Sequence, residues 1–201
     1  PYLVNYRLAH LLFHGSSKVP KGSRILVHGG SGGMGAMVTQ LARAHDCFII
    51  STCRTLEEAE FCRRAGADEV ILTGQEDYVA RVQELTNGDG VNFSFNGVGG
   101  DTLNRDTEIL VPFGEIQAYG YVAGKSLFDV HHVNKCIALK TFSADDFFPT
   151  PMFPAATKAM LEWFETGKLL PVETILPLSE VVEANRLLDS GKILGKIGLK
   201  P

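Results

Sequence analysis

A glycine-rich segment directly after a short apolar run constrains this chain more than any other feature. Residues 24–35 read Arg-Ile-Leu-Val-His-Gly-Gly-Ser-Gly-Gly-Met-Gly, and five glycines fall within seven positions. The apolar run predicts a strand, and the amphipathic pattern from Met37 to Ala42 predicts a helix. A strand, a tight glycine turn and a helix N-terminus together present backbone amides to a dinucleotide pyrophosphate. We therefore expect a phosphate-binding loop formed by Gly29, Ser31, Gly32, Gly33, Met34 and Gly35.

The composition narrows the class of protein further. A chain of 201 residues with 45% hydrophobic content can bury one core and carry an appendage. The net charge of −4 argues against nucleic acid as a partner. No apolar run is long enough to span a bilayer and no signal peptide is visible, so no membrane association is expected. The four cysteines form no CxxC pair, which favours reduced thiols in a cytoplasmic protein.

Strand-like and helix-like segments alternate along most of the chain. We expect strands at 24–29, 47–53, 69–73, 91–96, 115–120 and 138–143, with helices at 33–45, 56–65, 77–86, 101–110 and 128–136. Several of these strands are apolar throughout, as expected when helices cover both faces of a sheet. The alternation predicts an α/β fold, a Rossmann doubly wound parallel six-stranded sheet.

The two ends of the chain depart from this alternation. The first seventeen residues predict a helix with a buried face. After an aromatic and proline-rich segment near residue 143, we expect a helix at 155–166, an extended piece at 172–177, a helix at 179–190 with Ser179 as N-cap, and a strand at 193–200. The last segments do not fit the sheet as a regular unit. We therefore divide the chain into a dinucleotide-binding unit, 1–167, and a C-terminal segment, 168–201.

The glycine run also matches the spacing used by short-chain dehydrogenases. Those enzymes need a Tyr-x-x-x-Lys pair on a helix, and Tyr121 and Lys125 have that spacing. However, the pair falls in a glycine-punctuated loop after the fifth strand, and no serine stands at the usual distance upstream. The short-chain interpretation is therefore disfavoured.

Four further segments carry a more specific resemblance: Gln40-Leu41-Ala42, Ala65 to Ile71, Asn96 to Leu103, and Leu188 to Lys196. With the glycine run, they resemble the medium-chain dehydrogenase/reductase superfamily, in its zinc-free quinone oxidoreductase and enoyl reductase branch. The resemblance covers the chain in order. It implies hydride transfer from a nicotinamide cofactor to a small-molecule substrate, namely a quinone, an enone or an enoyl thioester. It also implies a homodimer.

Members of that superfamily carry a GroES-like catalytic domain before the cofactor domain. The resemblance therefore implies that this chain is the cofactor-binding part of an oxidoreductase, either an excised domain or part of a larger synthase. Its C-terminal segment, 168–201, would then pack on the catalytic domain. On this interpretation the chain alone has little activity.

The end of the second strand bears on which nicotinamide cofactor binds. An acidic residue there would hold the ribose hydroxyls of NAD(H), but the sequence reads Thr52-Cys53-Arg54-Thr55. Arg54 can contact a 2′-phosphate, which favours NADP(H) and leaves NAD(H) possible. Glu58 stands where the family often has a lysine, and Thr73 stands where it often has a tyrosine. An ordinary solvated turn residue is the less favoured alternative for Arg54.

The fourth and fifth strands end at residues that we expect along the nicotinamide half of the cleft, because ligands of open α/β sheets bind outside the carboxyl ends of strands. These residues are Asn96, Gly97, Val98, Tyr119, Gly120 and Tyr121. Tyr119 is equally compatible with a core aromatic. The sequence names no catalytic acid or base. The proton would come from water or from the catalytic domain.

No metal site is expected. His10 and His14 have the i, i+4 spacing of a zinc pair, but no third ligand accompanies them. Two other functions remain open on the sequence. One is a non-catalytic nucleotide-binding or dimerisation module, and the other is a relative of the zinc alcohol dehydrogenases.

Overall fold

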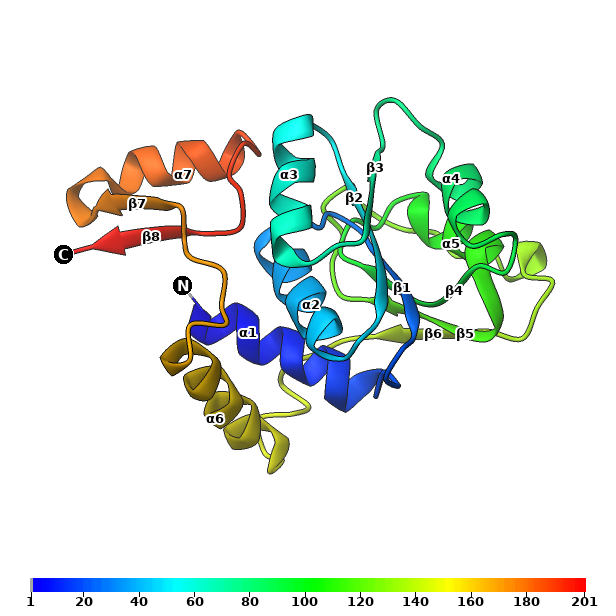
Figure 1. Ribbon diagram of the computed structural model, residues 1–201, viewed down its shortest axis with the longest axis horizontal. Coiled ribbons are helices and arrows are strands. Elements are labelled where there is room, and N and C mark those ends of the chain that lie inside the picture. Colours follow the sequence, from blue (N-terminus) through cyan, green and yellow to red (C-terminus); the bar gives the residue numbers. More distant parts are fainter. Residues whose placement is uncertain (1) are drawn as a thin grey trace.

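The computed structural model describes residues 2–201, and its centre is a six-stranded parallel sheet (Figure 1). The strands run in the spatial order β3-β2-β1-β4-β5-β6, and every neighbouring pair is parallel. Their bounds are β1 Arg24–Val27, β2 Phe48–Cys53, β3 Glu69–Leu72, β4 Val91–Asn96, β5 Leu110–Ala118 and β6 Ala138–Thr141. The predicted doubly wound α/β fold is confirmed.

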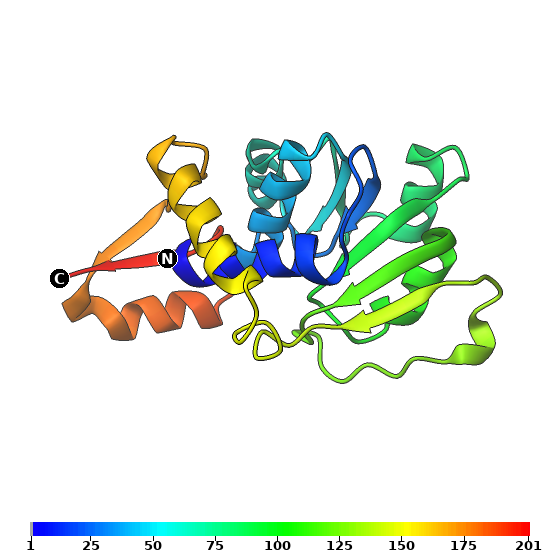
Figure 2. The same ribbon diagram turned by 90° about the horizontal axis from the view of Figure 1, so that it is seen from below.

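One face of the sheet is covered by α2 (Gly33–Ala44), α3 (Leu56–Ala65) and α1 (Tyr2–His10) with its π-helical extension Leu11–Ser16. Ile25, Val27 and Ile49 point to this side and join one apolar cluster. Helix α6 (Met152–Glu165) packs on the outside of α1 (Figure 2). The helix predicted for the first seventeen residues is present, although residue 1 lies outside the described part.

The opposite face is covered by α4 (Tyr78–Leu85) and α5 (Thr102–Ile109). Leu26 and Ile50 alternate with the residues above and enter a second apolar cluster on this side. Both side chains are fully buried. The apolar runs within β1 and β2 therefore serve two cores at once. Within residues 2–201, no helix is long and apolar enough to cross a bilayer.

The C-terminal segment forms a small unit of its own that extends from the main body (Figures 1 and 2). It comprises β7 (Thr174–Pro177), a 3-10 turn (Leu178–Glu180), α7 (Val181–Asp189) and β8 (Ile197–Lys200). Strands β7 and β8 pair with each other in parallel. We call residues 168–201 the tail. The predicted cap at Ser179 is wrong, because the 3-10 turn carries the chain to Glu180 and no side chain caps α7.

The helix predicted at 128–136 is also wrong, since only a 3-10 turn, Val130–His132, forms there. The backbone of this segment finds side-chain partners on and after α5. Asn104 binds the carbonyl of Leu127 and the amide of Asp129. The ammonium of Lys135 donates to two carbonyls at the end of α5 and the start of β5. These bonds hold the segment extended along α5.

Candidate functional site

The glycine segment forms a tight turn between β1 and α2. Gly29 has a positive φ of +63°, the left-handed region that favours glycine. The amide of Gly32 donates to the carbonyl of Gly29 at 3.0 Å, which closes the turn. A Cβ added at Gly35 would lie 2.4 Å from that same carbonyl oxygen. Only a glycine at position 35 therefore lets the first turn of α2 approach the loop so closely.

The glycine loop leads directly into the N-terminus of α2, beside residues 195 and 196 of the tail. Gly33, Met34 and Gly35 are the first residues of the helix, so their amides have no intrahelical acceptor. The helix dipole adds positive potential at this end. Gly32 precedes the helix in extended conformation, and a Cβ added there would meet only the Gly29 oxygen, at 3.3 Å. The loop therefore has the strand, glycine turn and helix order of an anion-binding site.

The side chains of the residues predicted near the end of β2 lie in different environments, some buried and some exposed. Cys53 is buried, and its thiol contacts Cys62 and the carbonyl of Thr55, so its side chain points into the core. Thr73 follows β3, is exposed, and donates to the carbonyl of Cys53 at 3.2 Å. Arg54 differs from both, since its charged side chain is 63% exposed and reaches solvent.

Arg54 is held by an acidic residue from α3. Its guanidinium lies 2.6 Å from Glu58, and its backbone amide donates to the same carboxylate at 2.7 Å. The hydroxyl of Ser31 also bonds to Glu58. Burial alone would raise the pKa of Glu58, but the bonds from Arg54 and Ser31 outweigh it and hold the pKa below its ordinary value. Glu58 therefore joins the phosphate loop to the end of β2.

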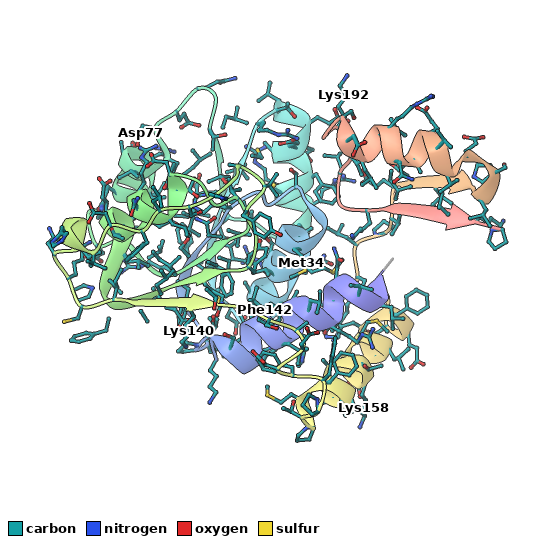
Figure 3. The ribbon with its side chains drawn as sticks, turned by 180° about the vertical axis from the view of Figure 1, so that it is seen from behind. Met34, Asp77, Lys140, Phe142, Lys158 and Lys192 are labelled. Atoms are coloured by element: carbon teal, nitrogen blue, oxygen red, sulfur yellow. The ribbon has the colours of Figure 1, made fainter. Side chains whose placement is uncertain are left out.

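The tail contacts this same region, which the sequence did not predict. The carbonyl of Gly191 accepts from the guanidinium of Arg54, and the amide of Gly195 donates to the carbonyl of Ser31 at 2.7 Å. The side chain of Lys196 passes beside Gly33, where an added Cβ would lie 2.8 Å from its Cε. Figure 3 shows Met34 at the start of α2 and Lys192 where the tail passes α3. In the sequence, the pair Gly195-Lys196 near the chain end was the feature that could have indicated this contact.

The ends of β4 and β5 form the other half of the site. The side-chain oxygen of Asn96 accepts from the amides of Val98 and Gly99, at 3.1 and 2.9 Å. Gly97 lies against the ring of Tyr119, so that an added Cβ would be 2.5 Å from the ring. Gly120 lies equally close to Gly97, where its added Cβ would be 2.6 Å from the carbonyl oxygen. The two predicted strand ends are therefore in contact.

The two tyrosines of this half have different environments. Tyr119 is half-buried and packs against the apolar core, and burial raises its pKa above the ordinary value. The side chain of Tyr121 is exposed beyond the strand end. Tyr121 can reach a ligand at the sheet edge directly, whereas Tyr119 shapes the wall behind Gly97.

Three histidines cluster at the opposite end of α2. The ring of His14 lies 4.5 Å from that of His10 and 5.1 Å from that of His45, measured between centroids. Burial, with smaller contributions from the neighbouring imidazoles, lowers the pKa of His14 to about 4. His45 was missed by the sequence analysis because it is distant along the chain. Among residues 2–201, no group of three or more donor side chains could hold a metal ion, so these residues do not fit a zinc site.

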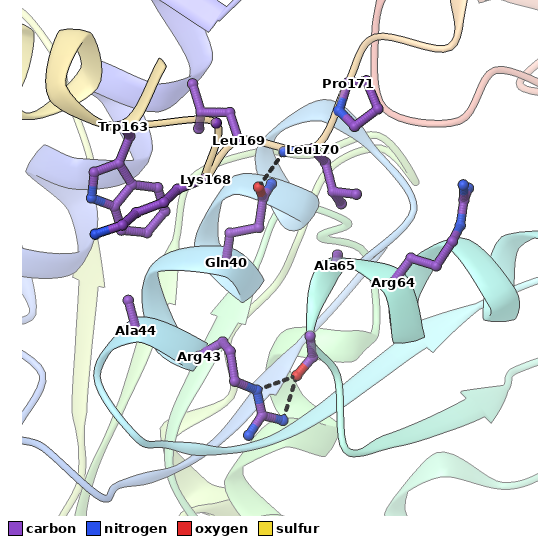
Figure 4. A pocket seen from close by; sticks show the side chains of 12 residues that line it. Gln40, Arg43, Ala44, Arg64, Ala65, Trp163, Lys168, Leu169, Leu170 and Pro171 are labelled. Carbon is purple, nitrogen blue, oxygen red and sulfur yellow. Dashed lines mark hydrogen bonds between the residues drawn. The ribbon is translucent and has the colours of Figure 1, made fainter. Parts of the chain in front are cut away.

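A pocket of about 690 Å³ lies between the C-terminal ends of α2 and α3 and the segment after α6 (Figure 4). Its rim contains Arg43, which binds the carbonyl of Gly66 at 2.9 Å, and Arg64, which pairs with Glu173 at 2.5 Å. Gln40 accepts from the amide of Leu170 across its floor. No predicted site residue lines this pocket, which is separate from the glycine loop.

The family model described as zinc-binding dehydrogenase matches residues 33–165, from the start of α2 to the end of α6. The chain belongs to the zinc-binding dehydrogenase family. This membership agrees with the resemblance to the medium-chain superfamily. Two of the relatives described below are named as a reductase and a probable quinone oxidoreductase.

Among those relatives, a 2-haloacrylate reductase from a Burkholderia species is 35% identical over 116 residues, covering 58% of this chain and 35% of that protein. A probable quinone oxidoreductase from Schizosaccharomyces pombe is 26% identical over 201 residues, covering 94% and 58%. A solved mycobacterial structure, complexed with NADPH, has a TM-score of 0.90 at 28% identity and covers 99% and 63%. The chain therefore spans less than two thirds of the length of each of these relatives.

Proposed function

We propose that this chain binds NADP(H) and forms the cofactor-binding part of an oxidoreductase that passes hydride to a quinone, an enone or an enoyl thioester. The observation that carries the proposal is the close approach of Gly35 to the carbonyl of Gly29, which brings the α2 N-terminus against the glycine loop. A mycobacterial relative of the same fold is complexed with NADPH, which supports the choice of ligand. The relatives' names support the reaction class.

In this proposal the two halves of the site hold the two halves of the dinucleotide. The amides of the glycine loop bind the pyrophosphate. Arg54 contacts the 2′-phosphate, and the backbone at Cys53 and the side chain of Thr73 border the adenosine. The strand ends of β4 and β5 border the nicotinamide. The proposed cofactor-binding residues are Gly29, Ser31, Gly32, Gly33, Met34, Gly35, Cys53, Arg54, Thr73, Asn96, Gly97, Val98, Tyr119, Gly120 and Tyr121.

The chemistry follows from positioning. A bound nicotinamide supplies the hydride, and the chain's own residues orient it. The contact between Gly97 and the Tyr119 ring gives the β4–β5 edge a fixed wall, and exposed Tyr121 stands beside it. We further propose that the chain has two units, 1–167 and 168–201, and that it forms a homodimer, as the resemblance implies. We also propose little turnover by this chain alone, because its relatives are longer.

A substitution at Gly32 tests the binding site. The backbone of Gly32 is in an ordinary extended region, but its added Cβ would lie a tight 3.3 Å from the Gly29 oxygen, so circular dichroism should first establish that Gly32→Val folds. The valine side chain would occupy the anion site, and we expect calorimetry to detect no NADP⁺ binding. Gly74→Val is the matched control, because nothing lies within 4 Å of its added Cβ. Tight binding by a folded Gly32→Val variant would contradict the assignment of the loop.

A substitution at Arg54 tests the choice of cofactor. Arg54→Ala should weaken NADPH by about tenfold or more and NADH by much less, because a charge-assisted bond contributes about 1.5–3 kcal/mol. Arg63→Ala, an exposed arginine on the same helix as Glu58, should change neither affinity. Equal weakening of both nucleotides by Arg54→Ala would remove Arg54 as the phosphate contact.

Turnover separates an enzyme from a binding module. NADPH oxidation at 340 nm should be followed with a quinone and, separately, with an enone. We expect slow oxidation by this chain alone and faster oxidation by a longer chain that also contains the region preceding it in its relatives. Nucleotide binding without oxidation by either chain would favour the non-catalytic module.

A further inference from the structure

A buried cluster of polar side chains lies beneath the carboxyl edge of the sheet, centred on Asp106 of α5. Asp106 is fully buried. One carboxylate oxygen faces His28 Nε2 and accepts from the Tyr78 hydroxyl, both at 2.9 Å. The other accepts from the Ser94 hydroxyl at 2.6 Å and from the Asn96 amide at 2.8 Å. Four side chains from three elements besides α5 therefore converge on one carboxylate.

The cluster keeps this carboxylate ionised. Burial would raise the pKa of Asp106, but the neighbouring His28 and the hydrogen bonds from its donors outweigh that cost and lower the pKa. An ionised carboxylate accepts hydrogen bonds and donates none. Every polar group that faces Asp106 must therefore present a hydrogen, which fixes the orientation of side chains that could otherwise turn either way.

Asn96 is the side chain for which this matters most. Its amide nitrogen donates to Asp106 and, at 2.9 Å, to the hydroxyl of Thr102. Its oxygen is thereby turned toward the amides of Val98 and Gly99. A flipped amide would place an oxygen against the carboxylate and an NH₂ group against two backbone donors. Asp106 thus determines the turn at 97–99, where Gly99 has a φ of +72°.

A second path runs from Asp106 to the glycine loop. The other ring nitrogen of His28, Nδ1, faces β2. It lies 3.3 Å from the hydroxyl of Thr52, which in turn accepts from the amide of Gly29 at 3.2 Å. Thr52 and His28 therefore connect the glycine loop to the carboxylate through hydrogen bonds.

We propose that Asp106 is a positioning residue for the cofactor site, because it orients Asn96, and through it the 97–99 turn, and orients His28 and Thr52 at the entry to the glycine loop. Its effect on nucleotide affinity rests on the proposed function. Its effect on the backbone does not.

Amide exchange in the nucleotide-free protein tests the backbone effect. Asp106→Asn places an NH₂ group among donors, and we expect exchange of the Val98 and Gly99 amides to accelerate by about tenfold, the equivalent of one lost hydrogen bond of roughly 1.4 kcal/mol. Ser94→Ala and Tyr78→Phe are matched controls, because each removes one bond to the same carboxylate without touching Asn96. After correction for stability, these controls should exchange as the wild type does. Unchanged exchange in Asp106→Asn, or equal acceleration in the controls, would overturn the proposal.

A second variant covers the case in which Asp106→Asn does not fold. Asn96→Asp keeps an oxygen for the two backbone amides but sets a second carboxylate against Asp106. His28 and Tyr78 are the other titratable groups that face Asp106. As the pH falls from 8 to 5.5, one of the two carboxylates takes a proton and becomes the missing donor.

Calorimetry with NADP⁺ should then show the affinity of Asn96→Asp, relative to wild type, rising about tenfold over that pH range. A flat ratio would contradict the proposal. If wild type does not bind NADP⁺, the proposed function fails, and the pH dependence of Val98 and Gly99 exchange in Asn96→Asp decides the positioning role instead. Faster exchange at pH 8 than at pH 5.5, relative to wild type, is then the expected result.

Discussion

The main sheet and the tail are both built from parallel strands joined through helices, but they differ in what covers them. Leu26 and Ile50 of the main sheet are fully buried, and helices pack on both of its faces. In the tail, Ile175 of β7 is 60% exposed and Leu199 of β8 is 39% exposed. The main sheet is thus stabilised by its two cores, whereas the tail is positioned by hydrogen bonds to the residues around the phosphate loop and by a few apolar side chains such as Leu169 and Leu194.

The largest expected effect is a cavity in the main sheet. Ile50→Ala removes a fully buried side chain from the second apolar cluster and should lower the free energy of unfolding by about 3 kcal/mol. Urea denaturation followed by circular dichroism measures it. A loss below about 1 kcal/mol would mean that this face is packed more loosely than its burial implies.

A smaller effect is expected where the tail meets the loop. Gly195 has a φ of +65°, and an added Cβ would lie 3.0 Å from the ring of Phe61. Gly195→Ala should destabilise the docked tail by about 1–2 kcal/mol, the cost of a left-handed alanine. Amide exchange in the tail should accelerate while the sheet strands stay protected.

Gly167→Ala is the matched control for the cost of placing an alanine in the left-handed region of the backbone. Its φ is also +65°, but nothing lies within 4 Å of its added Cβ. If both variants release the tail equally, the contact at Gly195 has no special part in docking.

Acid should act on the main body before the tail. The pKa of His14 falls from 6.5 to about 4 in the folded chain, so its neutral form adds stability that is present above pH 6.5 and lost as the pH falls toward 4. The tail contains no histidine. His14→Gln should therefore flatten the stability profile between pH 7 and 4.5 by about 1 kcal/mol. Urea denaturation at both pH values measures it, and a variant with the wild-type slope would contradict this assignment.

The smallest effect is expected at the exposed face of the tail. Ile175→Ala removes a side chain that is already 60% exposed and should change the free energy of unfolding by less than about 0.5 kcal/mol. A large loss in the same urea assay would show that Ile175 is covered in solution.

The sequence predicted the parts of the molecule that depend on local patterns. The strand–glycine–helix order of residues 24–35 was sufficient for the sheet and the loop, because each element is specified by its own periodicity and turn residues. The contacts of Asp106 with His28 and of Gly195 with Ser31 were not predictable, since each joins segments distant along the chain. The helix predicted at 128–136 failed for the same reason, because its backbone partners lie on α5 and β5.

The bond from the Gly195 amide to the Ser31 carbonyl links the position of the tail to the conformation of the phosphate loop. Ser31 also bonds through its hydroxyl to Glu58, so one residue of the loop is shared between the proposed anion site, α3 and the tail. A ligand that favours one arrangement of Ser31 favours the tail position that accompanies it. Reciprocity then requires that any surface fixing the tail changes the affinity of the loop for that ligand by the same factor.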